Sequence, residues 1–392
     1  MPADSGAAGV QADGQRNEGS LILYILITTA ALLPAYYARK HERAGKACLF
    51  TIFLVLTVPA VLRQETGNDY MRYVEVFHLA ASRAVVPTEP GFNRLARLVY
   101  ALCGYENYLL LFAIYAVLTV FFFLLAMKRL SPDFAFTLFV FLTSGYYFQS
   151  YNTVRYYFAL SIVLFALYFF LRREYVWFLL LVGLAALFHK SALLVLAFYP
   201  LALHVFRKWQ AVVPALFGAG MLLFKEQVMV LVRKLYPSYE GTEILAAGGR
   251  PSIGNILRCA LVLLLALGIL VRTGKVRETL ENPAGTRGRA RVFYINCTAM
   301  ALLLYVFGWF IPELSRICYY LTMTQIFLLP DVLSLLPAES RRRKVLTGAV
   351  LAAGILVFAV FLKNAAAPDI RILPYKTFLF HEMSQTPSRS IR

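Results

Sequence analysis

The sequence predicts an all-α, polytopic membrane protein with about twelve transmembrane helices. Hydrophobic residues make up 60% of the 392 positions and charged residues only 15%, whereas about a quarter of an average soluble domain is charged. A helix that crosses a bilayer needs about 20 apolar residues. Apolar runs near this length cover residues 20–38, 47–63, 107–127, 134–149, 154–171, 175–189, 191–206, 209–224, 255–271, 292–310, 317–336 and 345–362.

These runs define one membrane domain, 20–362, between two polar ends. Residues 1–19 are polar and rich in Gly and Ala, without the basic and apolar regions of a signal peptide, so we expect a disordered tail. Residues 93–104 (NRLARLVYALCG) predict an interfacial helix with Arg94 and Arg97 on its polar side. The expected loops are 63–106 and 225–254, and 363–392 forms the C-terminal tail. No internal repeat indicates an inverted-repeat transporter.

Basic residues mark every second connection between the runs. Twenty of the 39 Lys and Arg residues fall at 39–46, 128–129, 172–173, 207–208, 272–291 and 341–344. Cytoplasmic loops of membrane proteins are enriched in Lys and Arg, so these loops are predicted to be cytoplasmic and both termini periplasmic. The net charge of +18 is therefore read as a topology signal. We expect no nucleic-acid partner, because no polar domain exists to hold a duplex.

The five cysteines and the common cofactor motifs give no sign of a metal or a bound cofactor. The cysteines are isolated in or beside apolar runs, without CxxC spacing, so neither a disulfide framework nor a metal cluster is expected. The chain also lacks a Walker A loop, GxGxxG, GxSxG, HExxH and DxD. The short, basic cytoplasmic loops favour a donor that is already carried by the membrane over a soluble nucleotide sugar.

The loop 63–92 and several charged residues converge at the predicted outer level of the membrane. Ionisable residues at membrane depth are costly and tend to be functional. The residues that share this level are Arg63, Asp69, Glu89, Arg155, His189, Lys190 and Arg316. Arginines, carboxylates and aromatic residues together suit a polyhydroxylated ligand that bears phosphate. Two alternatives stay open: the loop is a solvated connector with an amphipathic helix, and the arginines snorkel to the interface.

Six short motifs stand in one order along the chain. They are Asn68-Asp69-Tyr70 with Tyr73, Glu89-Pro90-Gly91-Phe92, Asn152-Thr153-Val154-Arg155, Phe188-His189-Lys190-Ser191-Ala192, Arg316 with Tyr319 and Tyr320, and Pro374-Tyr375-Lys376-Thr377. In this order the motifs resemble the EpsG family of Wzy-like polysaccharide polymerases. One departure is that the family commonly has Arg-Gln where this chain has Arg155-Tyr156, so the Tyr156 hydroxyl would replace a glutamine contact to sugar.

The resemblance implies a fold similar to the GT-C membrane glycosyltransferases, in the bacterial inner membrane. It implies a polymerase that joins oligosaccharide repeat units, carried on undecaprenyl diphosphate, into exopolysaccharide or O-antigen at the outer face. A chain-length regulator is the protein partner that it suggests. Such an enzyme must stabilise charge on the departing diphosphate, and arginine can do so without a metal.

On this hypothesis Arg155 and Arg316 clamp the diphosphate, with Arg63 as a weaker candidate. Asp69, Glu89 and His189 are the candidates for the base that accepts the proton of the acceptor hydroxyl. The expected substrate-binding residues are Arg63, Tyr70, Tyr73, Tyr156, Lys190, Tyr319 and Tyr320.

Two other functions fit the same residues. A flippase or exporter of lipid-linked sugars would line a cavity through the membrane midplane with charge, whereas segments such as LVLLLALGIL (261–270) carry none. A ligase that moves finished polymer to a lipid A core would share the chemistry and differ only in its acceptor.

Overall fold

The computed structural model describes residues 5–82, 86, 88–204, 212–235, 250–311, 314–367 and 370–379. The predicted loops and tail at 225–254 and 363–392 lie partly outside these ranges, as does the basic pair at 207–208. Helices account for 78% of the chain, so the all-α class is confirmed.

The first half of the chain runs from the N-terminal helix to a long central one. Its elements are α1 (Ser5–Lys40), η1 (Glu42–Ala44), α2 (Gly45–Leu62), β1 (Arg63–Gln64), α3 (Tyr70–Ala81), α4 (Pro90–Cys103), α5 (Tyr108–Leu130), α6 (Phe134–Thr143), α7 (Tyr146–Gln149) and α8 (Val154–Leu171). The helix α1 begins at Ser5, where the sequence suggested a disordered tail up to residue 19. The helix α4 occupies the segment that was predicted as interfacial.

The second half packs around this group. Its elements are α9 (Tyr175–Ala186), η2 (Lys190–Leu194), α10 (Val195–Ala202), α11 (Val212–Leu223), α12 (Lys225–Leu235), α14 (Ile253–Arg272), α15 (Val276–Leu280), α16 (Gly285–Phe307), α17 (Leu314–Thr322), α18 (Gln325–Leu333), α19 (Arg341–Lys363) and β2 (Lys376–Thr377).

Seven of the described helices are long and apolar enough to cross a membrane: Glu18–Lys40, Glu42–Leu62, Tyr108–Leu130, Val154–Leu171, Ile253–Arg272, Gly285–Phe307 and Arg341–Lys363. The expectation of about twelve spans stays a prediction, because shorter apolar helices are also present and part of the chain lies outside the described residues. Where the structure describes the other five apolar runs, their helices are shorter than 18 residues; for example, Gly145 adopts a left-handed conformation (φ 77°) between α6 and α7. An apolar run looks the same in sequence whether its helix is continuous or broken.

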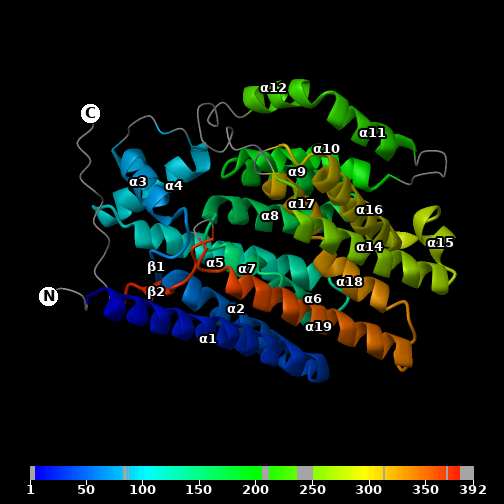
Figure 1. Ribbon diagram of the computed structural model, residues 1–392, viewed down its shortest axis with the longest axis horizontal. Coiled ribbons are helices and arrows are strands. Elements are labelled where there is room, and N and C mark those ends of the chain that lie inside the picture. The colour runs from blue at the N-terminus through cyan, green and yellow to red at the C-terminus, as the bar shows by residue number, and fades with distance from the viewer. Residues whose placement is uncertain are drawn as a thin grey trace.

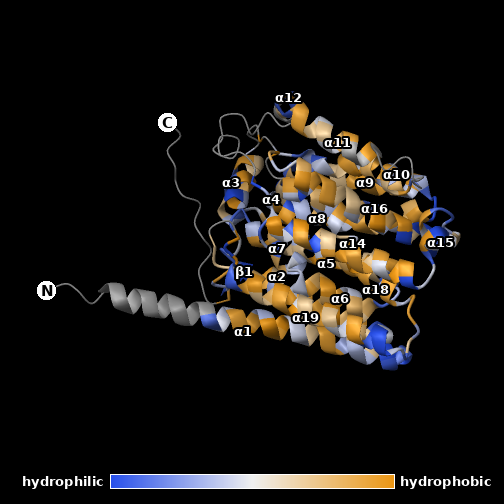
Figure 2. Cartoon of the chain, turned by 45° about the vertical axis from the view of Figure 1, so that its right-hand side comes forward, coloured by the Kyte–Doolittle hydropathy of each residue, from blue (hydrophilic) through white to orange (hydrophobic). Residues whose placement is uncertain are grey.

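The helix α8 forms the centre of the bundle. It is apolar on all sides, and 78% of its most hydrophobic stretch is buried, against 17% for α19. A helix that is hydrophobic all round is stable where neighbours cover it, whereas the exposed apolar surface of α19 suits contact with lipid. Figure 2 shows hydrophobic residues along the helices and hydrophilic ones gathered near their ends.

The connections with clustered Lys and Arg that the structure describes meet at one end of the bundle, which we call the basic end. Arg39 at the end of α1 pairs with Asp133 before α6 (3.0 Å), and Arg289 of α16 donates to the Leu171 carbonyl at the end of α8 (3.1 Å). The opposite end, here the strand end, carries α3, α4, β1 and β2 (Figure 1). The described basic connections therefore lie at one end, as the sequence predicted, while the place of 207–208 and the orientation in the membrane stay predictions.

The strand end is closed by the C-terminal segment. The strands β1 and β2 pair antiparallel, with Arg63 opposite Thr377. Tyr375 donates its hydroxyl to the Pro59 carbonyl (2.8 Å), and its backbone N–H donates to Ser20 Oγ (3.0 Å). The motif Pro374-Tyr375-Lys376-Thr377 thus ties the C-terminal segment to the middle of α1 and to the end of α2.

Candidate functional site

An ion pair between Glu89 and Arg155 lies at the centre of the candidate site, at the strand end. Arg155 Nη1 is 2.5 Å from Glu89 Oε2, and the side chains are 20% and 16% exposed, respectively. The second carboxylate oxygen of Glu89 accepts the backbone N–H of Lys190 (3.4 Å). Three segments that are far apart in sequence, one before α4, one at the start of α8 and one at η2, are thereby joined through one carboxylate.

The Glu-Pro-Gly sequence explains the position of this carboxylate. A residue before proline is pushed towards extended backbone, and Glu89 has φ −64° and ψ 147° as the N-cap of α4. Pro90 then begins the helix. Gly91 donates its N–H to the Leu187 carbonyl (2.8 Å), and a Cβ at this position would lie 2.6 Å from the same oxygen. Only glycine lets α4 approach the end of α9 this closely.

Two aromatic rings flank the Arg155 guanidinium. Its carbon lies 5.5 Å from the ring centroid of Tyr73 and 5.4 Å from that of Phe92, which is within the range of cation–π attraction. Burial raises the pKa of the Tyr73 hydroxyl, an effect that the nearby Arg155 opposes. Tyr73 therefore stays a neutral hydrogen-bond donor beside the ion pair.

Asp69 is held close to this pair by the motif Asn152-Thr153-Val154-Arg155. Its backbone N–H donates to Asn152 Oδ1 (3.1 Å), and its carboxylate acts electrostatically on Tyr73. Gly67, two residues earlier, has φ 105°, and a Cβ there would lie 2.5 Å from the Tyr151 carbonyl. Among the described residues, the half-buried Asp69 carboxylate has no ion-pair partner, unlike that of Glu89.

His189 joins the site through a hydrogen-bonded chain. Its Nδ1 lies 2.6 Å from Ser191 Oγ, which lies 3.0 Å from the Tyr320 hydroxyl. Burial, followed by the positive charges of Arg155, Arg316 and Lys190, lowers the pKa of His189 to about 3. A neutral imidazole with so low a pKa is a poor general base near pH 7.

Tyr156 and Arg316 connect α8 to α17. The Tyr156 hydroxyl donates to the Arg316 carbonyl (2.5 Å), and the Tyr156 ring packs edge-on against His189 and Tyr320. The Arg316 side chain acts electrostatically on Tyr73 and His189. The two predicted clamp arginines, Arg155 and Arg316, therefore share one neighbourhood, while the proton of the Tyr156 hydroxyl is used to hold the backbone of α17.

Arg63 and Tyr70 belong to a neighbouring cluster. Arg63 is 2% exposed, and its guanidinium lies 4.8 Å from the Tyr151 ring and 5.6 Å from the Phe112 ring. Tyr70 is also 2% exposed. Its ring stacks on the same Phe112 ring, with the two centroids 4.6 Å apart. Burial lowers the pKa of Arg63. These contacts give Arg63, which is part of β1, and Tyr70 a structural role, while their predicted contact with a substrate stays a prediction.

The structure adds two residues that sequence reasoning missed. Gln149 Oε1 accepts hydrogen bonds from Tyr157 (2.9 Å) and from Tyr319 (3.2 Å). Arg258, in the second turn of α14, lies 5.7 Å from the Tyr146 ring centroid, and its buried Nε and Nη2 have no hydrogen-bond partner among the described residues. The signal for Arg258 was present, because a single cation in the run ILRCALVLLL is unusual.

The fold and the site define a polytopic membrane protein in which arginines, a carboxylate and tyrosines from distant segments meet at one end of the helix bundle. The chain belongs to the EpsG family, whose family profile matches residues 46–377. No curated protein and no solved structure matches the chain. Membership of this family indicates a role like that of a polysaccharide polymerase, with glycosyltransferase-like chemistry.

Proposed function

We propose that the chain polymerises oligosaccharide repeat units that are linked to undecaprenyl diphosphate, at the outer face of the bacterial inner membrane. The observation that carries this proposal is the shared neighbourhood of Arg155, Arg316 and Asp69 at the end of the bundle opposite to the basic loops. By the positive-inside tendency that end faces outwards. Both termini would then be periplasmic.

In the proposed reaction, a hydroxyl oxygen of the acceptor unit attacks the anomeric carbon of the donor glycan. The bond from that carbon to the diphosphate oxygen breaks, and its electron pair leaves with the undecaprenyl diphosphate. Arg155 and Arg316 stabilise the charge that develops there, since fixed cations aimed at developing charge often make the largest catalytic contribution. In this scheme no metal ion is needed for the leaving group.

Asp69 is the base that this geometry favours. The proton of the acceptor hydroxyl has three candidate acceptors, and two are disfavoured: Glu89 is already paired with Arg155, and His189 has a pKa of about 3. The carboxylate of Asp69 has no ion-pair partner among the described residues. Glu89 then acts as a positioning residue that holds the Arg155 guanidinium.

The roles of the tyrosines follow from their contacts. Tyr73 lies against the Arg155 guanidinium and stays protonated, so it can donate to a phosphate or sugar oxygen. Tyr319 and Tyr320 are committed to Gln149 and Ser191, respectively, and position the site from α17. Lys190 is exposed beside Glu89 and supplies a further cation for the diphosphate.

The test compares two arginine substitutions in purified protein supplied with synthetic lipid-linked repeat units. Arg155→Gln should reduce polymer formation at least a hundredfold, by the magnitude typical for the loss of one charge-stabilising donor. Arg72→Gln is the matched control. Arg72 is exposed on α3, and its substitution removes the same charge near the same end of the bundle. Equal rates in the two variants would contradict the proposal.

A further inference from the structure

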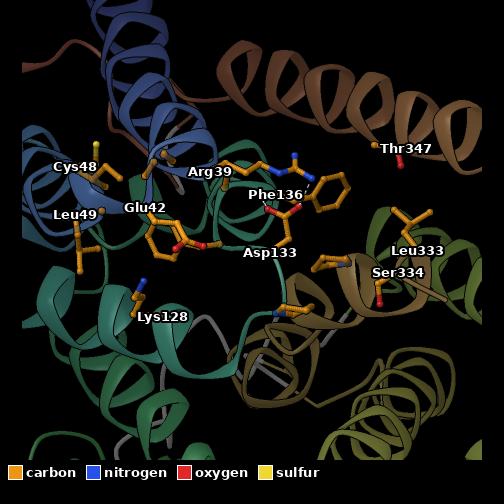
Figure 3. A pocket seen from close by; sticks show the side chains of 18 of the residues that line it. Arg39, Glu42, Cys48, Leu49, Lys128, Asp133, Phe136, Leu333, Ser334 and Thr347 are labelled. Carbon is orange, nitrogen blue, oxygen red and sulfur yellow. Dashed lines mark hydrogen bonds and ion pairs between the residues drawn. The ribbon is translucent and has the colours of Figure 1, made fainter. Parts of the chain in front are cut away.

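A large cavity lies at the basic end, far along the helices from the candidate site. It has a volume of about 690 Å³ and lies between α1, α2, α5, α6, α18 and α19. A second cavity of about 370 Å³ adjoins it and shares Pro132 and Arg287 with it. Figure 3 shows the larger cavity from close by.

The two cavities are lined by an excess of positive charge that comes from separate elements. Their cationic residues are Arg39, Lys128, Arg129, Arg172, Arg287 and Arg343, against the three carboxylates Glu42, Asp133 and Asp331. Asp133 is paired with Arg39 (3.0 Å) and Asp331 with Arg287 (3.1 Å). The carboxylates present do not neutralise the walls.

Three of these cations, Lys128, Arg129 and Arg343, have no carboxylate partner among the described residues. The Arg343 guanidinium donates one hydrogen bond among the described residues, to the Leu336 carbonyl, at a long 3.4 Å. The ammonium group of Lys128 forms no ion pair or hydrogen bond in the described ranges, and in Figure 3 Lys128 lies beside the cavity with Glu42 on the same side. Cations held in a concave, partly apolar site focus a positive potential onto it.

One wall of the cavity, formed by α2, is apolar. Its lining on α2 runs from Gly45 to Ile52 and includes Cys48 and Leu49, a depth of about 10 Å along the helix axis. A cationic rim over an apolar wall, at the ends of membrane helices, suits a phosphate group attached to an acyl chain.

We propose that this cavity binds a phosphate-bearing anion, the headgroup of an anionic lipid in the leaflet at the basic end. Lys128 and Arg343 contact the phosphate, and Cys48, Leu49 and Ile52 contact the first carbons of the chain. A soluble phosphate compound would satisfy the same cations but not the apolar wall. The proposal stands whether or not the protein is a polymerase, because it involves none of the residues at the strand end.

The test is a titration of the purified full-length protein with short-chain phosphatidylglycerol, short-chain phosphatidylcholine or inorganic pyrophosphate, followed by thermal unfolding. Phosphatidylglycerol should raise Tm in a saturable manner and phosphatidylcholine should not. Pyrophosphate acting as strongly as phosphatidylglycerol would support the anion site and assign it to a soluble ligand. If none of the three ligands shifts Tm, the proposal is wrong.

Paired variants separate this cavity from general surface charge. The double substitution K128Q/R343Q should weaken phosphatidylglycerol binding about tenfold, as expected when charge-assisted contacts are lost. The control R341Q/R342Q removes two exposed charges from the same segment of α19 and should change binding less than about twofold. Equal weakening in both would overturn the proposal.

A substitution that is expected to tighten binding controls for variants that lose affinity because they misfold. Glu42 lines the cavity and has no ion-pair partner among the described residues, so Glu42→Gln removes a repulsive charge and should tighten binding about threefold. A misfolded variant would not gain affinity. Unchanged or weaker binding by Glu42→Gln would count against a phosphate at this position.

Discussion

Replacing Glu89 by glutamine tests whether its ion pair with Arg155 orients the guanidinium for the reaction. The pair is 2.5 Å long, with side chains 16% and 20% exposed. At an effective dielectric constant of about 20, Coulomb's law gives roughly 7 kcal/mol of gross attraction at this distance. Removing two charges from water offsets most of it, so the net coupling should be about 2 kcal/mol, between the values for exposed and fully buried pairs.

The assay is a double-mutant cycle of Glu89→Gln, Arg155→Gln and their combination, with polymer formation from lipid-linked repeat units as the rate. A loss of 2 kcal/mol corresponds to about thirtyfold in kcat/KM for Glu89→Gln. Arg155→Gln should lose more, because it also removes a contact to the diphosphate. The combined variant should be no slower than Arg155→Gln alone, with Tm recorded for all three.

Two results would refute this reasoning. Effects that add within about 0.5 kcal/mol would show that the two residues act independently. A loss of more than about a thousandfold in Glu89→Gln alone, with an unchanged Tm, would make Glu89 itself the base and remove Asp69 from that role.

Three further predictions follow from other parts of the structure. The pKa of His189 is lowered from its ordinary value of 6.5 to about 3, so between these pH values the unfolded chain binds a proton that the folded chain does not. The protein should therefore lose stability as pH falls through this window. His189→Gln should flatten the dependence of Tm on pH between 7 and 5, and an unaltered slope would contradict this. Arg258→Met should raise the free energy of unfolding by about 1–3 kcal/mol, because buried guanidinium nitrogens without hydrogen-bond partners are costly. The same substitution should reduce polymer formation. A lower Tm would mean that the contact with Tyr146 outweighs the cost of burying those nitrogens. Gly67→Ala should lower the free energy of unfolding by at least about 2 kcal/mol, because alanine disfavours the positive φ and its Cβ would clash with Tyr151. Gly104 also has a positive φ but open space around it, so Gly104→Ala should lower the free energy of unfolding by about 1 kcal/mol. Equal losses for the two glycines would refute the steric part of the argument.

The general arrangement of this protein could be predicted because bilayers impose simple rules on sequence. Long apolar runs and alternating basic loops were sufficient to assign the class and to divide the helix ends into two groups. The charged motifs were expected at one level, and the structure indeed joins Glu89, Arg155 and Lys190 at the strand end. Their contacts were not predictable, because 66 residues separate Glu89 from Arg155.

The parts that sequence reasoning missed depend on packing. Arg63 packs against aromatic rings, whereas Arg155 pairs with a carboxylate. Which of these happens depends on neighbours from distant helices. Apolar runs also hid two charges within helices, Arg258 and Asp331. Asp331 is paired with Arg291 at 2.5 Å near the basic end, but Arg258 weakens the argument that uncharged spans speak against a transporter.

The measurement that tests the central claim most directly is the fate of synthetic undecaprenyl-diphosphate repeat units given to the purified protein in liposomes. Products are resolved by mass spectrometry with and without chelator, and the sidedness of the lipid is recorded in parallel. We expect a ladder of multimers that forms equally well with chelator. Repeat units that stay monomeric but cross the bilayer would contradict the account and identify a transporter.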